Sequence, residues 1–98
     1  ILEELVGEIR DEYDVAELGV ERLGEERFLV PGSLRIDEIK DRLGIELPEG
    51  EYETVAGFLM DQLGRIPRRR DVVAYGNRRL RVMSMHRRRV VQVLIERA

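Results

Sequence analysis

The sequence predicts an α+β fold in which two helices pack on a small, mostly antiparallel sheet. Two segments in the middle of the chain carry apolar residues at helical spacing, and the segments before and after them are short, rich in β-branched residues and separated by turn residues. With 98 residues, of which 43% are hydrophobic, the chain is large enough for one core and too small for two. We therefore expect one domain whose helices cover one face of the sheet.

The N-terminal segment is predicted to be an amphipathic helix. Its apolar stripe comprises Leu2, Leu5, Val6, Ile9 and Tyr13. Because no capping residue precedes Ile1, we expect residues 1–17 to be a linker helix from a preceding domain, and residues 18–98 to form the domain itself. An unpartnered stripe also favours self-association, so we expect at least weak homodimers through Leu2, Leu5 and Ile9.

A hairpin and a first helix come next. Residues 20–23 and 27–30 bracket a Gly-Glu pair and predict two short strands, which Pro31 and Gly32 bring to an end. The apolar residues Ile36, Ile39 and Leu43 share one helical face. We expect Ser33 or a nearby residue to cap this helix and Gly44 to close its last turn.

The second helix is predicted at residues 54–63. The preceding residues 47–53 contain Pro48, Gly50 and three carboxylates, which is typical of an exposed acidic loop. Gly57 inside the helix indicates the close approach of another backbone, because glycine costs about 1 kcal/mol against alanine there. Gly64, Ile66 and Pro67 form a well-marked stop, in which Ile66 is expected to fold back on the last turn.

The C-terminal third is predicted to be a three-stranded antiparallel meander. Its strands are expected at residues 72–75, 79–85 and 90–95, with turns at Gly76-Asn77 and around residues 86–88. In the middle strand, alternation places Leu80, Val82 and Ser84 on one face, and Arg81, Met83 and Met85 on the other.

Composition limits the chemistry of the chain. It has no cysteine and one histidine, which excludes disulfides and argues against a zinc site. No apolar run approaches the about 20 residues that cross a bilayer. His86 lacks a visible nucleophile or carboxylate partner, and Ser33, Thr54 and Ser84 are explained as caps or strand positions. We therefore expect no enzyme, no catalytic residue and no cofactor.

An acidic loop raises the question of a metal site. Glu49, Glu51 and Glu53 could offer oxygen ligands to a hard cation such as magnesium. Their spacing is not that of a calcium loop, and magnesium prefers few carboxylates together with waters. We therefore interpret these residues as a solvated loop and expect no metal site.

Charge is divided along the chain, although the net charge is only -3. Residues 1–62 hold 18 acidic and 6 basic residues, and residues 63–98 hold 2 acidic and 11 basic ones. The basic residues include two runs, Arg68–Arg70 and Arg87–Arg89. These runs could bind nucleic-acid phosphates, an anionic membrane surface or acidic protein segments. Because aromatic residues are only 5% and no recognition helix is marked, nucleic acid is not expected.

The order of these features resembles the CorC/HlyC transporter-associated domain over essentially the whole chain. The most specific part is Thr54-Val55-Ala56-Gly57 through Gly64-Arg65-Ile66-Pro67. Residues 6–13 look like the linker that joins a preceding pair of CBS domains to this module in that family. The chain departs from the family pattern at the two arginine runs. The resemblance also implies similarity to part of the FAD-binding fold of certain oxidoreductases, although no Gly-rich phosphate loop supports flavin binding here.

The resemblance implies a regulatory or interaction domain of a hemolysin-like or magnesium and cobalt efflux-type membrane protein, one that modulates ion transport. Upstream CBS and transmembrane domains would be its partners, and the module, itself soluble, would lie at the cytosolic face of the plasma (inner) membrane. We expect Arg65 to form a structural or interface ion pair, and Arg68, Arg69 and Arg70 to meet an anionic partner. The alternatives are a sensor of adenine nucleotides or another small ligand, and a nucleic-acid-binding module.

Overall fold

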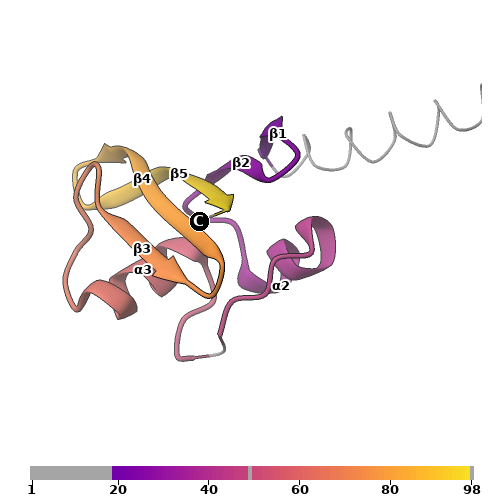
Figure 1. The fold of residues 1–98 in the computed structure, drawn as a ribbon. Coiled ribbons are helices and arrows are strands. Elements are labelled where there is room, and N and C mark those ends of the chain that lie inside the picture. Colours follow the sequence, from indigo (N-terminus) through magenta and orange to yellow (C-terminus); the bar gives the residue numbers. More distant parts are fainter. Residues whose placement is uncertain (1–18, 49, 98) are drawn as a thin grey trace, which may run out of the picture.

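The computed structural model describes residues 19–48 and 50–97, which form an antiparallel sheet with two helical segments on one of its faces (Figure 1). The strands are β1 (Glu21–Gly24), β2 (Arg27–Pro31), β3 (Val72–Tyr75), β4 (Arg78–His86) and β5 (Arg89–Arg97). The helical segments are α2 (Ile36–Glu38) with η1 (Ile39–Leu43), and α3 (Val55–Leu63). The α+β fold is thus confirmed, and all three strands of the C-terminal meander lie within one or two residues of the predicted ranges.

The sheet joins the two ends of the described chain. Its strand order is β1-β2-β5-β4-β3, so the early hairpin meets the meander through β2 and β5. At the end of β2, Gly32 donates its N–H to the Val91 carbonyl at 3.0 Å, and a Cβ on Gly32 would lie 2.2 Å from the Val90 carbonyl oxygen. Only glycine allows the chain to leave β2 so close to β5.

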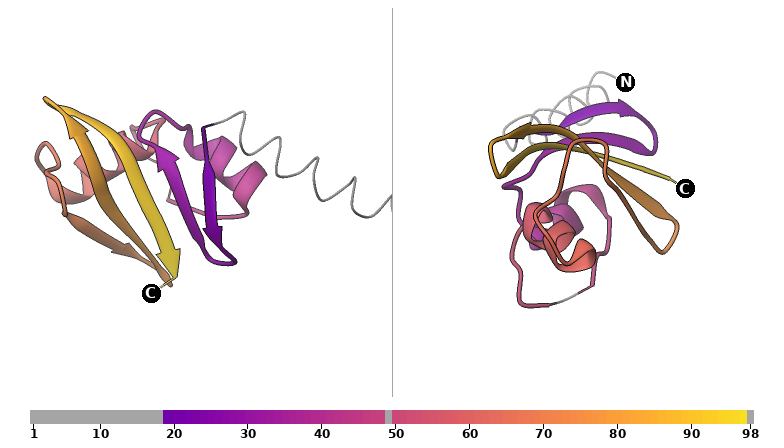
Figure 2. Two further views of the ribbon diagram at one scale, coloured as in Figure 1. Left: turned by 90° about the horizontal axis from the view of Figure 1, so that it is seen from above. Right: turned by 90° about the vertical axis from the view of Figure 1, so that its left-hand side faces the viewer.

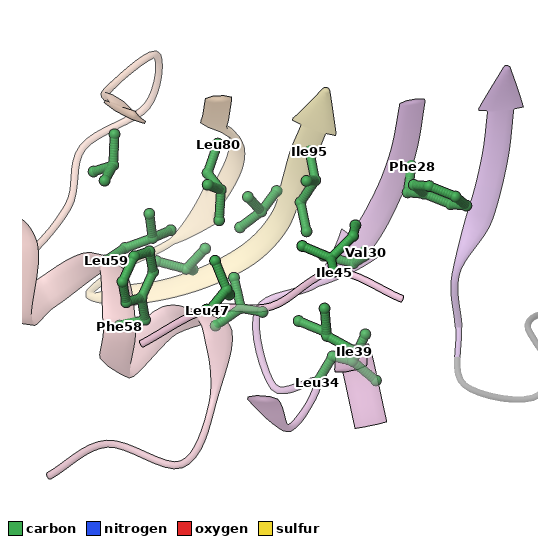
Figure 3. Packing of buried hydrophobic residues seen from close by; sticks show 14 of the residues in the cluster. Phe28, Val30, Leu34, Ile39, Ile45, Leu47, Phe58, Leu59, Leu80 and Ile95 are labelled. Atoms are coloured by element: carbon green, nitrogen blue, oxygen red, sulfur yellow. The ribbon is translucent and has the colours of Figure 1, made fainter. Parts of the chain in front are cut away.

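The core lies between the helical segments and the inner face of the sheet (Figures 2 and 3). β4 and β5 place Leu80 opposite Ile95 and Val82 opposite Val93, and all four side chains are buried. The helical segments and the loop between them contribute further fully buried side chains, chiefly Ile39, Ile45, Val55, Phe58 and Leu59. Burial of such side chains contributes about 1.5–3 kcal/mol each.

The first helix differs from the prediction at its start and in its pitch. The N-cap is Arg35, not Ser33, and no side chain caps the helix. The reason is that Arg35 stays extended in a β-bridge with Thr54, and Ile36 donates its N–H to the Glu53 carbonyl at 2.9 Å. After one α-turn the helix widens to a π-turn, which Gly44 closes at φ 70° as expected.

The second helix agrees closely with the prediction. Thr54 caps α3, with Oγ1 accepting the Gly57 N–H at 3.2 Å. A Cβ on Gly57 would lie 2.9 Å from the Cβ of Tyr52, which confirms a close approach at this position. The loop before α3 is not wholly exposed as predicted, because Leu47 is buried and Tyr52 packs against the core.

Two predicted side-chain positions are wrong. Irregular pairing between Val82 and Met85 interrupts the alternation of β4, and Met85 packs against the core instead of facing away from it. After α3, Ile66 is 40% exposed, whereas Pro67 is fully buried. Pro67, rather than Ile66, is therefore the buried apolar residue of this stop.

Candidate interaction surface

The loop between α3 and β3 is held by one carboxylate. Asp71 accepts the Arg68 N–H at 2.7 Å and two nitrogens of the Arg65 guanidinium, at 2.8 and 3.1 Å. Both interactions stabilise the ionised carboxylate, so Arg65 first and the Arg68 N–H second lower the pKa of Asp71. The same pair raises the pKa of Arg65. A bidentate pair across six residues fixes the ends of the loop relative to one another.

The loop is also tied to the sheet. Arg70 donates its N–H to the Val82 carbonyl at 2.8 Å, and Val82 donates to the Asp71 carbonyl at 2.8 Å. Arg70 has φ 77°, in the left-handed region that a side chain rarely adopts. The backbone of the loop is therefore held in place, while the side chains of Arg68, Arg69 and Arg70 are all exposed.

The second arginine run occupies the turn between β4 and β5. His86 pairs with Arg89, and Arg87 has φ 57°. Residues 86–89 are all exposed. This turn and the loop before β3 lie at the same end of the sheet, away from the C-terminal end of β5 (Figures 1 and 2). We call Arg68, Arg69, Arg70, Arg87, Arg88 and Arg89 together the arginine end.

Another group of arginines lies on the face of the sheet opposite the helices. Glu96 of β5 has Arg27 on β2 to one side and Arg79 and Arg81 on β4 to the other, at N–O distances of 3.6, 3.5 and 4.0 Å. The Glu96 side chain is 16% exposed. We call these four residues the Glu96 cluster. Sequence analysis missed it, because nothing local signals that Arg27 and Glu96 are neighbours.

A cavity of about 700 Å³ lies beside α2 and η1. Tyr52 closes one side, where its hydroxyl donates to the Pro48 carbonyl, and burial raises the pKa of this hydroxyl. Arg35 at the rim pairs with Asp37 at 3.1 Å and approaches Glu53 at 3.9 Å. The wall thus combines apolar groups with charges of both signs. The other lining residues are Ile36, Lys40, Asp41, Glu46, Leu47 and Gly50.

The other candidate residues have simpler environments. Ser33, Glu51 and His86 are exposed, and Ser84 lies at the irregularity of β4. Leu2, Leu5, Ile9 and Glu49 lie outside the described residues. Within residues 19–48 and 50–97, no three His, Cys, Asp or Glu side chains are grouped so as to hold a metal ion. None of the helices in these ranges has the length and apolarity to span a bilayer.

Comparison with known proteins gives a consistent result. Residues 21–98 match the family model CorC_HlyC, described as a transporter associated domain. The chain is 33% identical to Hemolysin C of Brachyspira hyodysenteriae over 99% of this chain and 37% of that protein. It is 32% identical to the magnesium and cobalt efflux protein CorC of Vibrio cholerae over 97% of this chain and 33% of that protein.

Solved structures agree in fold. The CorC_HlyC domain of a Xylella fastidiosa hemolysin, in complex with Mg++ and Mn++, is 26% identical and matches with a TM-score of 0.70, covering 81% of this chain and 96% of that one. The chain spans only 14% to 37% of the length of the curated relatives. Those relatives are thus longer proteins, of which the matched region is one part.

Proposed function

This chain belongs to the CorC/HlyC family of transporter-associated domains, and on that premise we propose that it is a non-catalytic regulatory domain that modulates ion transport by a hemolysin-like or magnesium and cobalt efflux-type membrane protein. Upstream CBS and transmembrane domains of the parent protein are its partners, reached through residues 1–17. The domain acts from the cytosolic face of the plasma membrane.

The observation that carries this proposal is the arginine end. Six guanidinium groups are exposed on two neighbouring turns, and none of them forms an ion pair among those that the structure records. Two of the turn residues, Arg70 and Arg87, hold left-handed backbone conformations in which glycine or asparagine is usual. The presence of arginine at these two positions favours a role for its charge over a role in forming the turn.

We propose that the arginine end docks on anionic lipid headgroups. Each Lys or Arg near such a surface contributes about 1 kcal/mol. Since the Asp71 contacts already hold the loop in place, its backbone loses little conformational freedom on docking, and the entropic cost of binding is small. A change in the upstream domains, transmitted through residues 1–17, would then change how firmly the domain is held at the membrane.

Vesicle sedimentation tests the membrane contact. The chain should bind phosphatidylglycerol vesicles and not phosphatidylcholine vesicles. Changing Arg68, Arg69 and Arg70 to Gln should weaken binding about 100-fold, because three charges of about 1 kcal/mol each are lost. A matched triple, Arg22→Gln, Arg42→Gln and Arg97→Gln, removes the same charge elsewhere and should weaken binding much less. Equal loss in the two variants, or unchanged binding in the first, would contradict docking through this end.

The regulatory role is tested in the full-length parent. The Arg68–Arg70 variant should change the rate of Mg²⁺ or Co²⁺ export, while the matched triple should leave it close to that of the original protein. An unchanged rate would refute modulation through the arginine end. Stronger binding to short RNA or DNA duplexes than to the vesicles would favour the nucleic-acid alternative instead.

The cavity beside α2 supports a second candidate, a sensor of a small ligand. Tyr52 offers an aromatic wall, and Lys40 and Arg35 offer cations to an anionic group such as a nucleotide phosphate. A thermal-shift screen with adenine nucleotides separates the two functions, because a ligand bound only by the folded chain raises the unfolding temperature. Lys40→Gln should remove such a shift and leave vesicle binding in place.

Divalent ions enter the proposal as transported ions of the parent. The Mg++ and Mn++ of the Xylella fastidiosa domain do not identify ligands here, because the described residues contain no group of three suitable side chains. The same thermal-shift screen, run with MgCl₂ and MnCl₂, tests whether the domain itself responds to these ions.

A further inference from the structure

The sheet has an apolar centre on the face that the helices do not cover. Ile95 and Val93 face the core, so alternation turns Leu94 to the opposite, outer face. Leu94 is nevertheless only 4% exposed, and its cross-strand neighbours are Leu29 and Arg81. Leu94 is thus already buried, and the apolar surface that this face leaves open comes from the more exposed side chains around it. The outer side of an uncovered antiparallel sheet is normally polar, so open apolar side chains there favour a covering partner.

Apolar and basic groups surround this centre. Val72, at the end of the same cross-strand row, is 41% exposed, and Met83, two positions after Arg81, is 42% exposed. Beside the row, the Glu96 cluster sets three arginines against one carboxylate. Glu21 of β1 adds a further carboxylate at the far edge. The centre of the outer face therefore offers apolar contacts with an excess of positive charge.

We propose that residues 1–17 of this same chain dock on the outer face of the sheet as an amphipathic helix. This segment has the complementary pattern: an apolar stripe that includes Leu2, Leu5 and Ile9, and seven carboxylates against a single arginine. The stripe packs on Leu29, Val72 and Met83, and the carboxylates meet the excess arginines of the Glu96 cluster. The apolar core of this contact excludes water and strengthens the charge pairs at its edge.

The tether makes this occupant favourable. The segment ends at residue 17, only three residues before β1, whose Glu21 begins the cross-strand row that runs through Leu94 to Val72. Seventeen helical residues span about 25 Å, and a five-stranded sheet is about 19 Å wide, so the segment reaches across the face. A short tether gives the segment a millimolar effective concentration, which a free partner rarely reaches.

This inference deepens the proposed function and rests on it for its consequence. If residues 1–17 transmit the state of the upstream domains, their docking and release on the outer face is the step that does so. The docking itself involves no residue of the arginine end. Failure of the docking test with vesicle binding intact would therefore refute this step alone, and the reverse result would refute the membrane contact alone.

The absence of cysteine makes a direct test possible, because a single introduced cysteine can carry a spin label. With the label at Glu8→Cys of the 98-residue chain, NMR signals of the Leu94 methyl groups should be lost, while those of Leu59, in the helical layer, should be broadened much less. Leu59 lies in α3, which covers the other face of the sheet, and so serves as an internal control. Equal broadening of both, or of neither, would overturn the proposal.

Two further samples identify the occupant. In the spin-labelled chain, the double change Leu5→Asp and Ile9→Asp interrupts the apolar stripe without altering the sheet, and it should restore the Leu94 signals. Asp11→Asn, on the polar side of the same segment, should not restore them. Mixing spin-labelled chain with isotope-labelled chain that lacks the label tests for a second copy. If the Leu94 signals are lost only in the mixture, a neighbouring chain is the occupant and docking within one chain is refuted.

Discussion

Two groups of arginines on this domain have opposite surroundings. In the Glu96 cluster, three arginines from two strands converge on one carboxylate that is 16% exposed. At the arginine end, Asp71 binds Arg65 and the loop backbone, and among residues 19–48 and 50–97 no salt bridge involves the exposed side chains of the two runs. The first group is thus paired within the sheet, whereas the second group is exposed at one end of the sheet.

The comparison shows that arginine content alone does not separate structural charges from charges available to a partner. What separates them is the register of the strands. Pairing of β5 with both β2 and β4 brings Glu96 opposite Arg27 and Arg79, whereas five of the six residues of the arginine end lie in connections, and the sixth, Arg89, pairs at the end of β5 with His86, which offers no carboxylate. Three changes should therefore affect the two groups differently: one at the junction of β2 and β5, one at Glu96, and one at Asp71, which braces the loop of the arginine end.

The largest expected effect comes from Gly32, because both groups depend on β5. Gly32→Ala would place a Cβ 2.2 Å from the Val90 carbonyl, at the start of the strand that also carries Glu96. Neither backbone can give way without losing the Gly32–Val91 hydrogen bond, so we expect a loss of about 3 kcal/mol or more in the free energy of unfolding. Urea denaturation measures it. Gly24→Ala, where the nearest atom would be 4.0 Å away, is the control and should change stability by less than about 1 kcal/mol.

The next largest effect is expected at the centre of the Glu96 cluster. Glu96→Gln would remove the charge of a carboxylate that is 16% exposed and leave its three arginines, which are 41% to 54% exposed, without a counter-charge, with a loss of about 1–3 kcal/mol in unfolding free energy. Glu53→Gln is the control. Glu53 approaches Arg35 at 3.9 Å, and the two side chains are 79% and 52% exposed, so its loss should cost less than about 1 kcal/mol. Equal losses would show that burial does not distinguish the cluster from a surface pair.

Much of the fold could be predicted because its signals are local. Thr54, Gly57 and Gly64 mark the bounds of α3 and its close contact with Tyr52, and Gly76 with Asn77 marks the turn between β3 and β4. The π-turn of η1 has no such signal, since its apolar residues also fit an ordinary helix. The displacement of Met85 depends on pairing between whole strands, which no single segment encodes.

The arginine runs were visible in the sequence, but their surroundings were not. Sequence alone placed Arg68–Arg70 in a connection after α3, and the structure adds that Arg70 is tied to Val82 and that Asp71 braces the loop. The Glu96 cluster could not be foreseen, because it joins residues that are 69 positions apart along the chain. Whether these groups meet a membrane or residues 1–17 stays a prediction.

The smallest effect tests the brace of the arginine end through its pH dependence. The pKa of Asp71 is lowered in the folded chain, chiefly by Arg65. The ionised carboxylate therefore stabilises the fold above its unfolded pKa, and this contribution is lost as pH falls through the lower, folded pKa. Asp71→Asn should reduce the unfolding temperature at neutral pH, and the difference from the original chain should vanish in strong acid.

A second aspartate controls for acid effects in general. Asp37 also has a lowered pKa, chiefly through Arg35, but its side chain is 66% exposed against 20% for Asp71. Solvent screens the more exposed pair, so Asp37→Asn should shift the unfolding temperature less at every pH and lose more of that shift in high salt. If Asp71→Asn leaves stability unchanged but weakens vesicle binding, Asp71 positions the arginines of the loop for binding and does not stabilise the fold. If it changes neither, Asp71 does not hold the loop, and the rigidity assigned to the arginine end is wrong.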